Sequence, residues 1–315
     1  MSGIRAGGMT LAVCLTLVGA PLTGRQVFRA DVDAVSADVL VTRDGRPVAG
    51  LTAADFELRD NGVVQQIDMV ALDALPITLV LALDTSESVA GEPLEHLRAA
   101  VDAAAESLRA DDRLALMTFS HQVRTIAPPT SDHARVREAA RAVTAVGATS
   151  LYDATFAAVV MRHQVGGRAV LLVFSDGDDT TSWLDPRHVL EAAQRSDVVV
   201  YGVTLQAAVR NHDAAAVIQR RMERHRFHED PVLFGRHYLS LLVEDTGGSL
   251  LVAEHSEQLR ETFVRVVSEF RQRYVLTYTP RGVAAGGWHE IDVRLQGPRA
   301  DVRARRGYMR GPAAR

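Results

Sequence analysis

The sequence predicts an α/β protein with a Rossmann-like, doubly wound and mostly parallel sheet, inserted in a small β-sandwich. Two observations predict the α/β part: strand-like apolar runs alternate with amphipathic helical segments over residues 75–273, and two of those runs end in an aspartate. A third observation predicts the sandwich, because period-two strand patterns occur on both sides of this region. The net charge of −4 and the 23% of charged residues give no support to a nucleic-acid-binding surface.

The first 24 residues are predicted to be a secretory signal peptide. Arg5 supplies a positive charge, Met9 to Ala20 is apolar, and Val18-Gly19-Ala20 provides small residues for cleavage. The apolar stretch has about 12 residues, whereas a membrane-spanning helix needs about 20, so an uncleaved membrane anchor is the less favoured alternative. Cys14 in this segment is the only cysteine, so a mature chain would contain no disulfide. We therefore expect a secreted or periplasmic protein that meets the membrane only if the segment is uncleaved.

Residues 27–74 are predicted to be the N-terminal part of the sandwich. Every second residue from Val35 to Val41 is apolar, and Asp44-Gly45 follows as a turn. Asn61-Gly62 separates two further alternating runs. This dipeptide predicts a hairpin, because both central turn positions require positive φ.

The next stretch is predicted to form the central strand of the sheet. The run from Ile77 to Leu83 is interrupted only by Thr78 and ends in Asp84, Ser86 and Ser88 at alternate positions. Such a run is typical of a strand buried on both faces of a parallel sheet. Because open α/β sheets bind ligands at the carboxyl ends of their strands, these polar side chains are expected at the functional edge.

The remaining α/β elements follow in alternation, which predicts helices on both faces of the sheet. Expected strands cover residues 113–119, 123–126, 169–174, 198–203 and 250–252. Expected helices cover residues 94–108, 131–145, 150–163, 186–195 and 256–272, with one exposed helix near 212–226.

Residues 274–310 return to strand patterns, with strands expected at 274–279, 288–295 and 300–306. Neither terminal group of strands can bury a core alone, since isolated hairpins are marginally stable. We therefore predict that residues 27–74 and 274–310 combine into one β-sandwich that carries the α/β domain as an insertion.

Three polar motifs together predict a metal site. Asp84, Ser86 and Ser88 offer the oxygen ligands that suit Mg²⁺. The Gly-x-Thr loop that ends at Thr149 opens a helix, and Asp176-Gly177 follows a second buried strand. The order Asp-x-Ser-x-Ser, Gly-x-Thr and Asp-Gly resembles the metal-ion-dependent adhesion site (MIDAS) of von Willebrand factor type A (VWFA) domains.

The resemblance implies a ligand set of Asp84, Ser86, Ser88, Thr149 and Asp176 around Mg²⁺, with Mn²⁺ or Ca²⁺ as alternatives. It further implies a non-enzymatic cell-adhesion or assembly module, in which a carboxylate from a partner protein completes the metal shell. The flanks resemble a group of secreted bacterial "VWFA-related" proteins common in acidobacteria. The matching residues are Gly50-Leu51-Thr52 with Asp55-Phe56, the Arg273–Tyr278 run, and Arg305-Arg306-Gly307-Tyr308.

Several alternatives compete with this hypothesis. The three hydroxyl residues could merely cap helices, and Asp178, Asp179 and Glu87 could be solvated loop acids. A zinc site is disfavoured because the histidines have no compact spacing; they are His212, His225, His228 and His237.

Two other functional classes compete with an adhesion module. A Mg²⁺-dependent phosphohydrolase would need an acidic residue where Ser86 stands and a lysine, and the chain has no lysine. A structural envelope protein with an inactive metal site is the third possibility, which the intact ligand set argues against.

Overall fold

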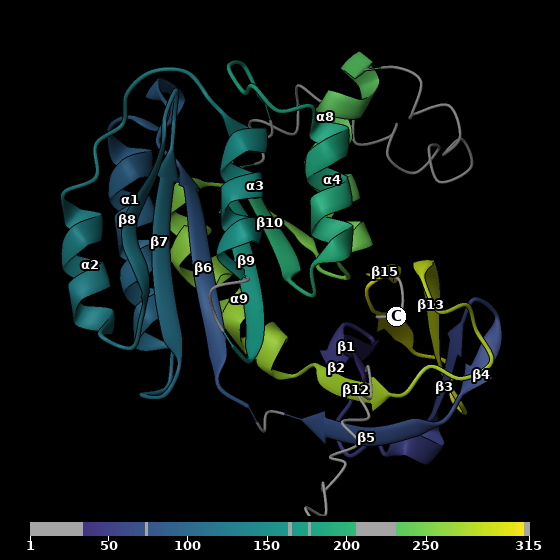
Figure 1. Ribbon diagram of the computed structural model, residues 1–315. Coiled ribbons are helices and arrows are strands. Elements are labelled where there is room, and N and C mark those ends of the chain that lie inside the picture. Colours follow the sequence, from purple (N-terminus) through teal and green to yellow (C-terminus); the bar gives the residue numbers. More distant parts are fainter. Residues whose placement is uncertain (1–33, 73–74, 163–165, 176–177, 206–230, 312–315) are drawn as a thin grey trace, which may run out of the picture. The chain divides into compact units, whose positions relative to one another are not determined.

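A six-stranded sheet with helices on both faces forms the α/β part of the chain (Figure 1). The computed structural model describes residues 34–72, 75–162, 166–175, 178–205 and 231–311, which belong to one compact unit, Asp33–Arg315. The predicted signal peptide and the helix expected near 212–226 lie outside the described residues. Among the residues described, no helix combines the length and apolar character that crossing a membrane requires.

The sheet is mostly parallel, as predicted, and β6 lies inside it. Its strands, in spatial order, are β11 (Leu250–Ala253), β10 (Val199–Leu205), β9 (Arg168–Phe174), β6 (Ile77–Asp84), β7 (Arg113–Phe119) and β8 (Val123–Thr130). Only β8 pairs antiparallel with its neighbour, and it is longer than the predicted companion strand. Every residue of β6 is buried, which agrees with the uninterrupted apolar run in its sequence.

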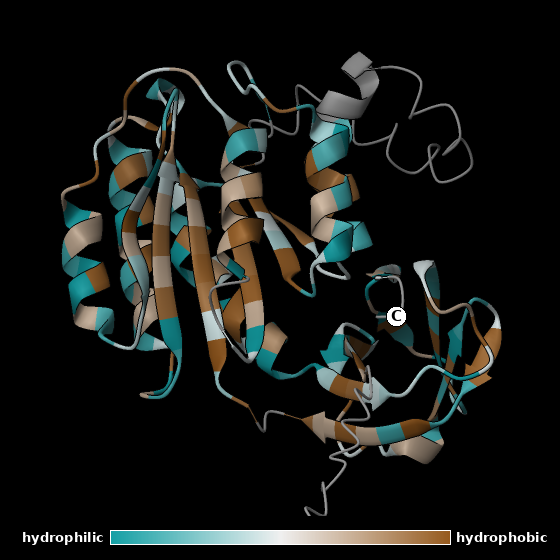
Figure 2. Ribbon diagram, viewed as in Figure 1, coloured by the Kyte–Doolittle hydropathy of each residue, from teal (hydrophilic) through white to brown (hydrophobic). Residues whose placement is uncertain are grey.

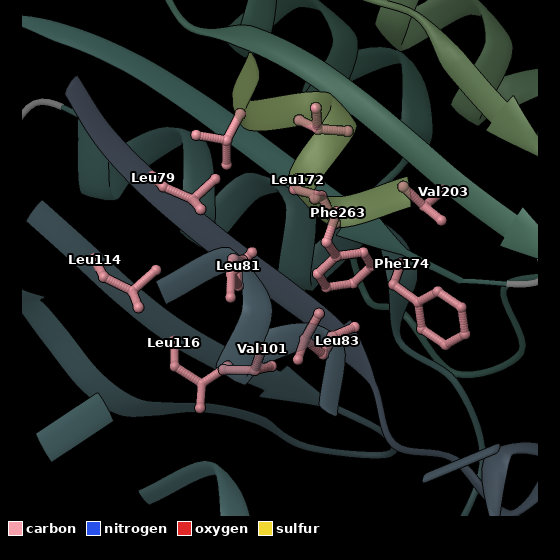
Figure 3. Packing of buried hydrophobic residues seen from close by; sticks show 14 of the residues in the cluster. Leu79, Leu81, Leu83, Val101, Leu114, Leu116, Leu172, Phe174, Val203 and Phe263 are labelled. Atoms are coloured by element: carbon pink, nitrogen blue, oxygen red, sulfur yellow. The ribbon is translucent and has the colours of Figure 1, made fainter. Parts of the chain in front are cut away.

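Side chains of β6 alternate between two hydrophobic cores. Leu79, Leu81 and Leu83 pack in one core with α1 (Glu92–Glu106), α2 (His133–Arg141) and α9 (Leu259–Arg271) (Figure 3). Val80 and Ala82 point to the other face, where the core includes α3 (Leu151–Arg162), α4 (Pro186–Arg195) and α8 (Pro231–Asp245). Figure 2 shows the apolar strands between helices that have both apolar and polar residues. One layer of helices therefore covers each face of the sheet.

Most helices agree with the predictions, but α8 was not among those expected, and α9 begins at Leu259 after the 3₁₀ helix η4 rather than at residue 256. α2 ends at Arg141 rather than near residue 145, and the side chain of Asp132 accepts a hydrogen bond from Arg135 N at its start. Beyond its end, Arg98 Nη2 donates to the carbonyl of Val143, a tertiary contact that helical periodicity does not reveal. Short 3₁₀ helices occur at η1 (Ala53–Asp55), η2 (Glu87–Val89) and η4 (Ser256–Gln258).

Strands from both ends of the chain pair with each other in two antiparallel sheets. One sheet has the order β14 (Asp301–Arg303), β1 (Val35–Arg43), β12 (Tyr274–Tyr278) and β5 (Ile67–Leu72), with β2 (Arg46–Pro47) beside β1. The other has the order β15 (Gly307–Arg310), β13 (Gly287–Leu295), β3 (Phe56–Asp60) and β4 (Val63–Gln65). Buried side chains of both sheets share one core cluster.

The strand predicted at 300–306 is confirmed only over β14 and ends at Arg303 rather than at Arg306. The chain forms β14 in one sheet and β15 in the other, and Arg306 lies between them. Its N–H donates to the carbonyl of Asp245 and its own carbonyl accepts from Ile291 N. These contacts with other elements interrupt the strand. The predicted hairpin is present, with Asn61 and Gly62 at φ of 46° and 80° between β3 and β4.

Candidate metal-binding site

Asp84 is held rigidly at the carboxyl end of β6. The residue is 1% exposed; its Oδ1 accepts a hydrogen bond from Ser86 N at 2.8 Å, and its Oδ2 accepts one from Ser175 Oγ at 3.1 Å. Ser175 directly follows β9, which is the neighbour of β6. Sequence reasoning did not single out Ser175. The available signal was its place at the end of a buried strand, next to a predicted ligand.

Ser86 and Ser88 present a pair of hydroxyls next to this carboxylate. Their Oγ atoms are 3.0 Å apart, with Ser86 buried and Ser88 exposed. Ser86 precedes the short helix η2, but its side chain makes no capping hydrogen bond there. Helix capping therefore does not explain the serine at this position, which favours a ligand role.

The loop that carries Thr149 is hydrogen-bonded to the loop that carries the two serines. Val146 N donates to the carbonyl of Thr85 at 2.8 Å, and Glu87 N donates to the carbonyl of Gly147 at 2.9 Å. Gly147 has a φ of +80°, and a Cβ built on it would lie 2.3 Å from His121 Nδ1. The left-handed conformation therefore favours glycine at this position, and a larger residue would also have to displace the exposed imidazole of His121.

Thr149 is buried, and its backbone is fixed by the segment that follows β9. Its N–H donates to Thr180 Oγ1 at 2.9 Å, and its carbonyl accepts from Thr180 N at 2.9 Å and Thr181 N at 3.0 Å. Sequence reasoning missed both of these threonines. Asp176, the fifth predicted ligand, lies outside the described residues, so its position stays a prediction.

Asp179 is not simply a solvated acid, as one alternative had it. Its Oδ2 accepts a hydrogen bond from Tyr152 N at 3.2 Å, and Ser182 Oγ accepts from Tyr152 N and Asp153 N at 3.1 and 3.2 Å. Asp179 and Ser182 therefore accept hydrogen bonds from N–H groups in the first turn of α3. They cap this helix, which is the role that the capping alternative assigns to Thr149. Burial and the charges of nearby aspartates raise the pKa of Tyr152 to about 12.

The donor set fits a hard divalent cation. The described ligand candidates are one carboxylate and three hydroxyls, all of them oxygen donors of the kind that Mg²⁺ uses together with water. Among the described residues there is no group of three or more His, Cys, Asp or Glu side chains that could hold a metal. Most of the histidines considered for zinc, His212, His225 and His228, lie outside the described residues.

Comparisons with known proteins agree on the type of domain. Residues 79–178 match the family model of the von Willebrand factor type A domain. Human inter-alpha-trypsin inhibitor heavy chain H4 is 23% identical over 181 residues; the match covers 53% of this chain but only 18% of that protein. The chain therefore spans less than a fifth of the length of this curated relative.

The chain is also similar to solved structures. A von Willebrand factor type A protein from Catenulispora acidiphila has a TM-score of 0.50 at 11% identity, covering 79% of this chain and 71% of that one. The vWF domain of the type V pili tip protein Mfa5 from Porphyromonas gingivalis has a TM-score of 0.44 at 11% identity, covering 67% of this chain and 98% of that one. The match to the family model over residues 79–178 shows that the chain contains a von Willebrand factor type A domain, and the fold of the Catenulispora acidiphila protein agrees with it.

Proposed function

We propose that the protein is a non-enzymatic adhesion or assembly module that captures a carboxylate of a partner protein through a bound divalent cation, Mg²⁺ in the first place. The observation that carries this proposal is the pairing of the loops. Buried Asp84 and the hydroxyls of Ser86 and Ser88 lie on one loop, and the loop of Thr149 is hydrogen-bonded to it. We include Asp176 as the fifth ligand, from the sequence motif.

The chemistry of the set supports capture of an outside anion. A bound cation would supply an electrophilic position for a carboxylate oxygen. Hydroxyl ligands carry no formal charge, so they neutralise such a cation less than a cage of carboxylates would. The residues of the chain hold their positions through the hydrogen bonds from Ser175 and Thr180, and no nucleophile or general base is needed for binding.

We further propose that the two antiparallel sheets form a β-sandwich (residues 27–74 and 274–310) into which the domain of residues 75–273 is inserted. With the predicted signal peptide 1–24, this arrangement suits a secreted or periplasmic bacterial protein. The type V pili tip protein Mfa5, whose vWF domain has a similar fold, belongs to a surface structure by its name, which supports an extracytoplasmic role.

Isothermal titration calorimetry with Mg²⁺ tests the metal site first. The protein is compared with the Ser86→Ala/Ser88→Ala variant and with Ser36→Ala, which removes an exposed hydroxyl on β1. We expect Mg²⁺ binding that the double variant loses and the control keeps. Equal Mg²⁺ binding by all three proteins would contradict the proposed metal site.

Capture of a partner is the second test. The protein is immobilised and exposed to envelope and culture fractions in Mg²⁺ and in EDTA, in parallel with the double serine variant. A protein retained only by the unsubstituted chain in Mg²⁺ supports a metal-bridged contact. Retention that is unchanged by EDTA and by the substitutions would contradict a metal-bridged contact.

A further inference from the structure

Trp183 is 96% exposed and lies on the segment that is hydrogen-bonded to the loop of Thr149. Tryptophan is highly buried on average in folded proteins, because exposing its large ring to water is unfavourable. Among the described residues, the next most exposed large apolar side chain is Val64 at 57%. Tryptophan is also strongly enriched among the residues that dominate binding energy at protein interfaces.

The backbone around Trp183 is fixed against the segment that carries Thr149. Ser150 Oγ and Thr181 Oγ1 are 2.8 Å apart. Trp183 N donates to Asp153 Oδ2 at 3.0 Å, and Leu184 N donates to Asp153 Oδ1 at 3.0 Å. Residues 180–184 therefore follow residues 149–153 along the start of α3, and the ring of Trp183 extends from a preorganised backbone.

The segment that carries Trp183 is rich in acidic residues. The same segment contains Asp178, Asp179 and Asp185, and all three carboxylates contribute, after burial, to raising the pKa of Tyr152 to about 12. A negative field of this kind favours a cation over an uncharged or acidic group. The face of an indole ring also attracts cations through its quadrupole, more strongly than tyrosine or phenylalanine does.

We propose that Trp183 and its flanking carboxylates receive an arginine or lysine side chain of the protein that docks at the metal site. This inference rests on the proposed function and specifies its partner: a protein segment that presents an acidic side chain to the site and a basic side chain close to it. The acidic group would bind the cation that Ser86 and Ser88 help to hold, and the basic group lies on the ring of Trp183.

A peptide array tests the inference with defined probes. Eight-residue Gly/Ser peptides carry one Asp and, at each other position in turn, one Arg; matched peptides replace Arg by citrulline, its neutral analogue, or Asp by Asn. The array is probed in Mg²⁺ and in EDTA with the full chain, with Trp183→Ala and with Trp288→Phe. Trp288, on β13, is the other tryptophan of the chain and is 38% exposed.

For the full chain and the Trp288→Phe control, we expect the best Arg peptides to bind about two- to fivefold more strongly than their citrulline analogues, the range of an exposed cation–π contact. The Trp183→Ala variant should lose this preference while unfolding at an unchanged temperature. Equal binding of Arg and citrulline peptides, or a preference that survives Trp183→Ala, would overturn the inference.

The two proposals fail separately in this experiment. Binding that requires Asp and Mg²⁺ but is equal for Arg and citrulline peptides would support the proposed function and overturn the basic contact. A preference for arginine that depends on Trp183, with Asn peptides and EDTA making no difference, would keep the basic contact and overturn the metal-bridged carboxylate. An array without signal above the Gly/Ser background would overturn both.

Discussion

At the scale of single residues, the candidate site depends on groups that do not themselves face a ligand. Ser175 donates a hydrogen bond to one oxygen of Asp84 while the backbone of Ser86 donates to the other. Both carboxylate oxygens are thereby oriented by the protein. Groups that orient metal ligands commonly change metal affinity by about 10- to 100-fold when removed.

Ser175→Ala is therefore expected to weaken Mg²⁺ binding by about tenfold, because Asp84 loses the donor that orients it. Calorimetric titration measures the affinity, and Ser196→Ala serves as the matched control. Ser196 is also a buried serine, but its hydroxyl accepts a hydrogen bond from Val198 N, away from the site. Equal affinities of the two variants would show that Ser175 does not position the carboxylate.

At the scale of elements, two contacts between segments distant in the sequence are important. One is the passage of the Thr149 loop beside His121, where Gly147 leaves room for the imidazole. The other is the meeting of the two antiparallel sheets at Asp60 of β3. Tyr278 of β12 and Tyr308 of β15 donate to Asp60 Oδ2 at 3.0 and 2.9 Å, and His289 Nδ1 lies 2.7 Å from Asp60 Oδ1. All four residues are buried.

Gly147→Ala should destabilise the protein by more than the roughly 1–2 kcal/mol expected for a left-handed backbone alone, because the added methyl group also meets His121. A double-mutant cycle with His121→Ala separates the two costs. In chemical denaturation, the glycine substitution should be less costly in the His121→Ala background. The same cost in both backgrounds would show that the imidazole does not restrict this loop.

Alkaline pH should destabilise the terminal sheets through their tyrosines. Burial, then the hydrogen bond to Asp60, raise the pKa of Tyr308 to about 12, whereas an unfolded tyrosine titrates near 10. The folded state therefore retains a proton that the unfolded state releases, so the stabilisation is present below about pH 10 and falls as pH rises toward 12.

Denaturant titrations between pH 8 and 11.5 measure this effect. Tyr308→Phe should flatten the alkaline decline and, near neutral pH, lower the free energy of unfolding by about 1–3 kcal/mol through the lost hydrogen bond. An unchanged pH dependence in the variant would assign the decline to other groups.

At the scale of the whole molecule, polar contacts join the α/β sheet to the terminal strands. Arg168, the first residue of β9, is buried, and its Nε donates to Asp38 Oδ1 of β1 at 2.9 Å. Arg273, fully buried where α9 leads into β12, donates from Nε to Tyr201 OH at 3.0 Å. At another position, Arg306 forms an ion pair with Glu244 Oε2 at 2.7 Å. A buried charge such as that of Arg168 is costly unless it is paired.

Asp38→Ala is expected to lower the free energy of unfolding by about 3 kcal/mol, because Arg168 is left as a buried charge without its carboxylate partner. Asp292→Ala is the matched control, since the Asp292–Arg294 pair has side chains that are 43% and 67% exposed. That control should change stability by less than about 1 kcal/mol. Comparable losses in both variants, measured by chemical denaturation, would contradict a special role for the buried pair.

The sequence by itself determined the alternation of strands and helices, the Asn61-Gly62 hairpin and the place of Asp84 at the end of a buried strand. These features depend on local periodicity and turn chemistry, which neighbouring residues encode. Only the tertiary structure decided that Ser175 orients Asp84 and that Thr180 holds Thr149. It also decided that the chain changes sheets at Arg306. These contacts join residues far apart in the chain, and their partners depend on how strands order themselves in space. No spacing within one segment carries that information.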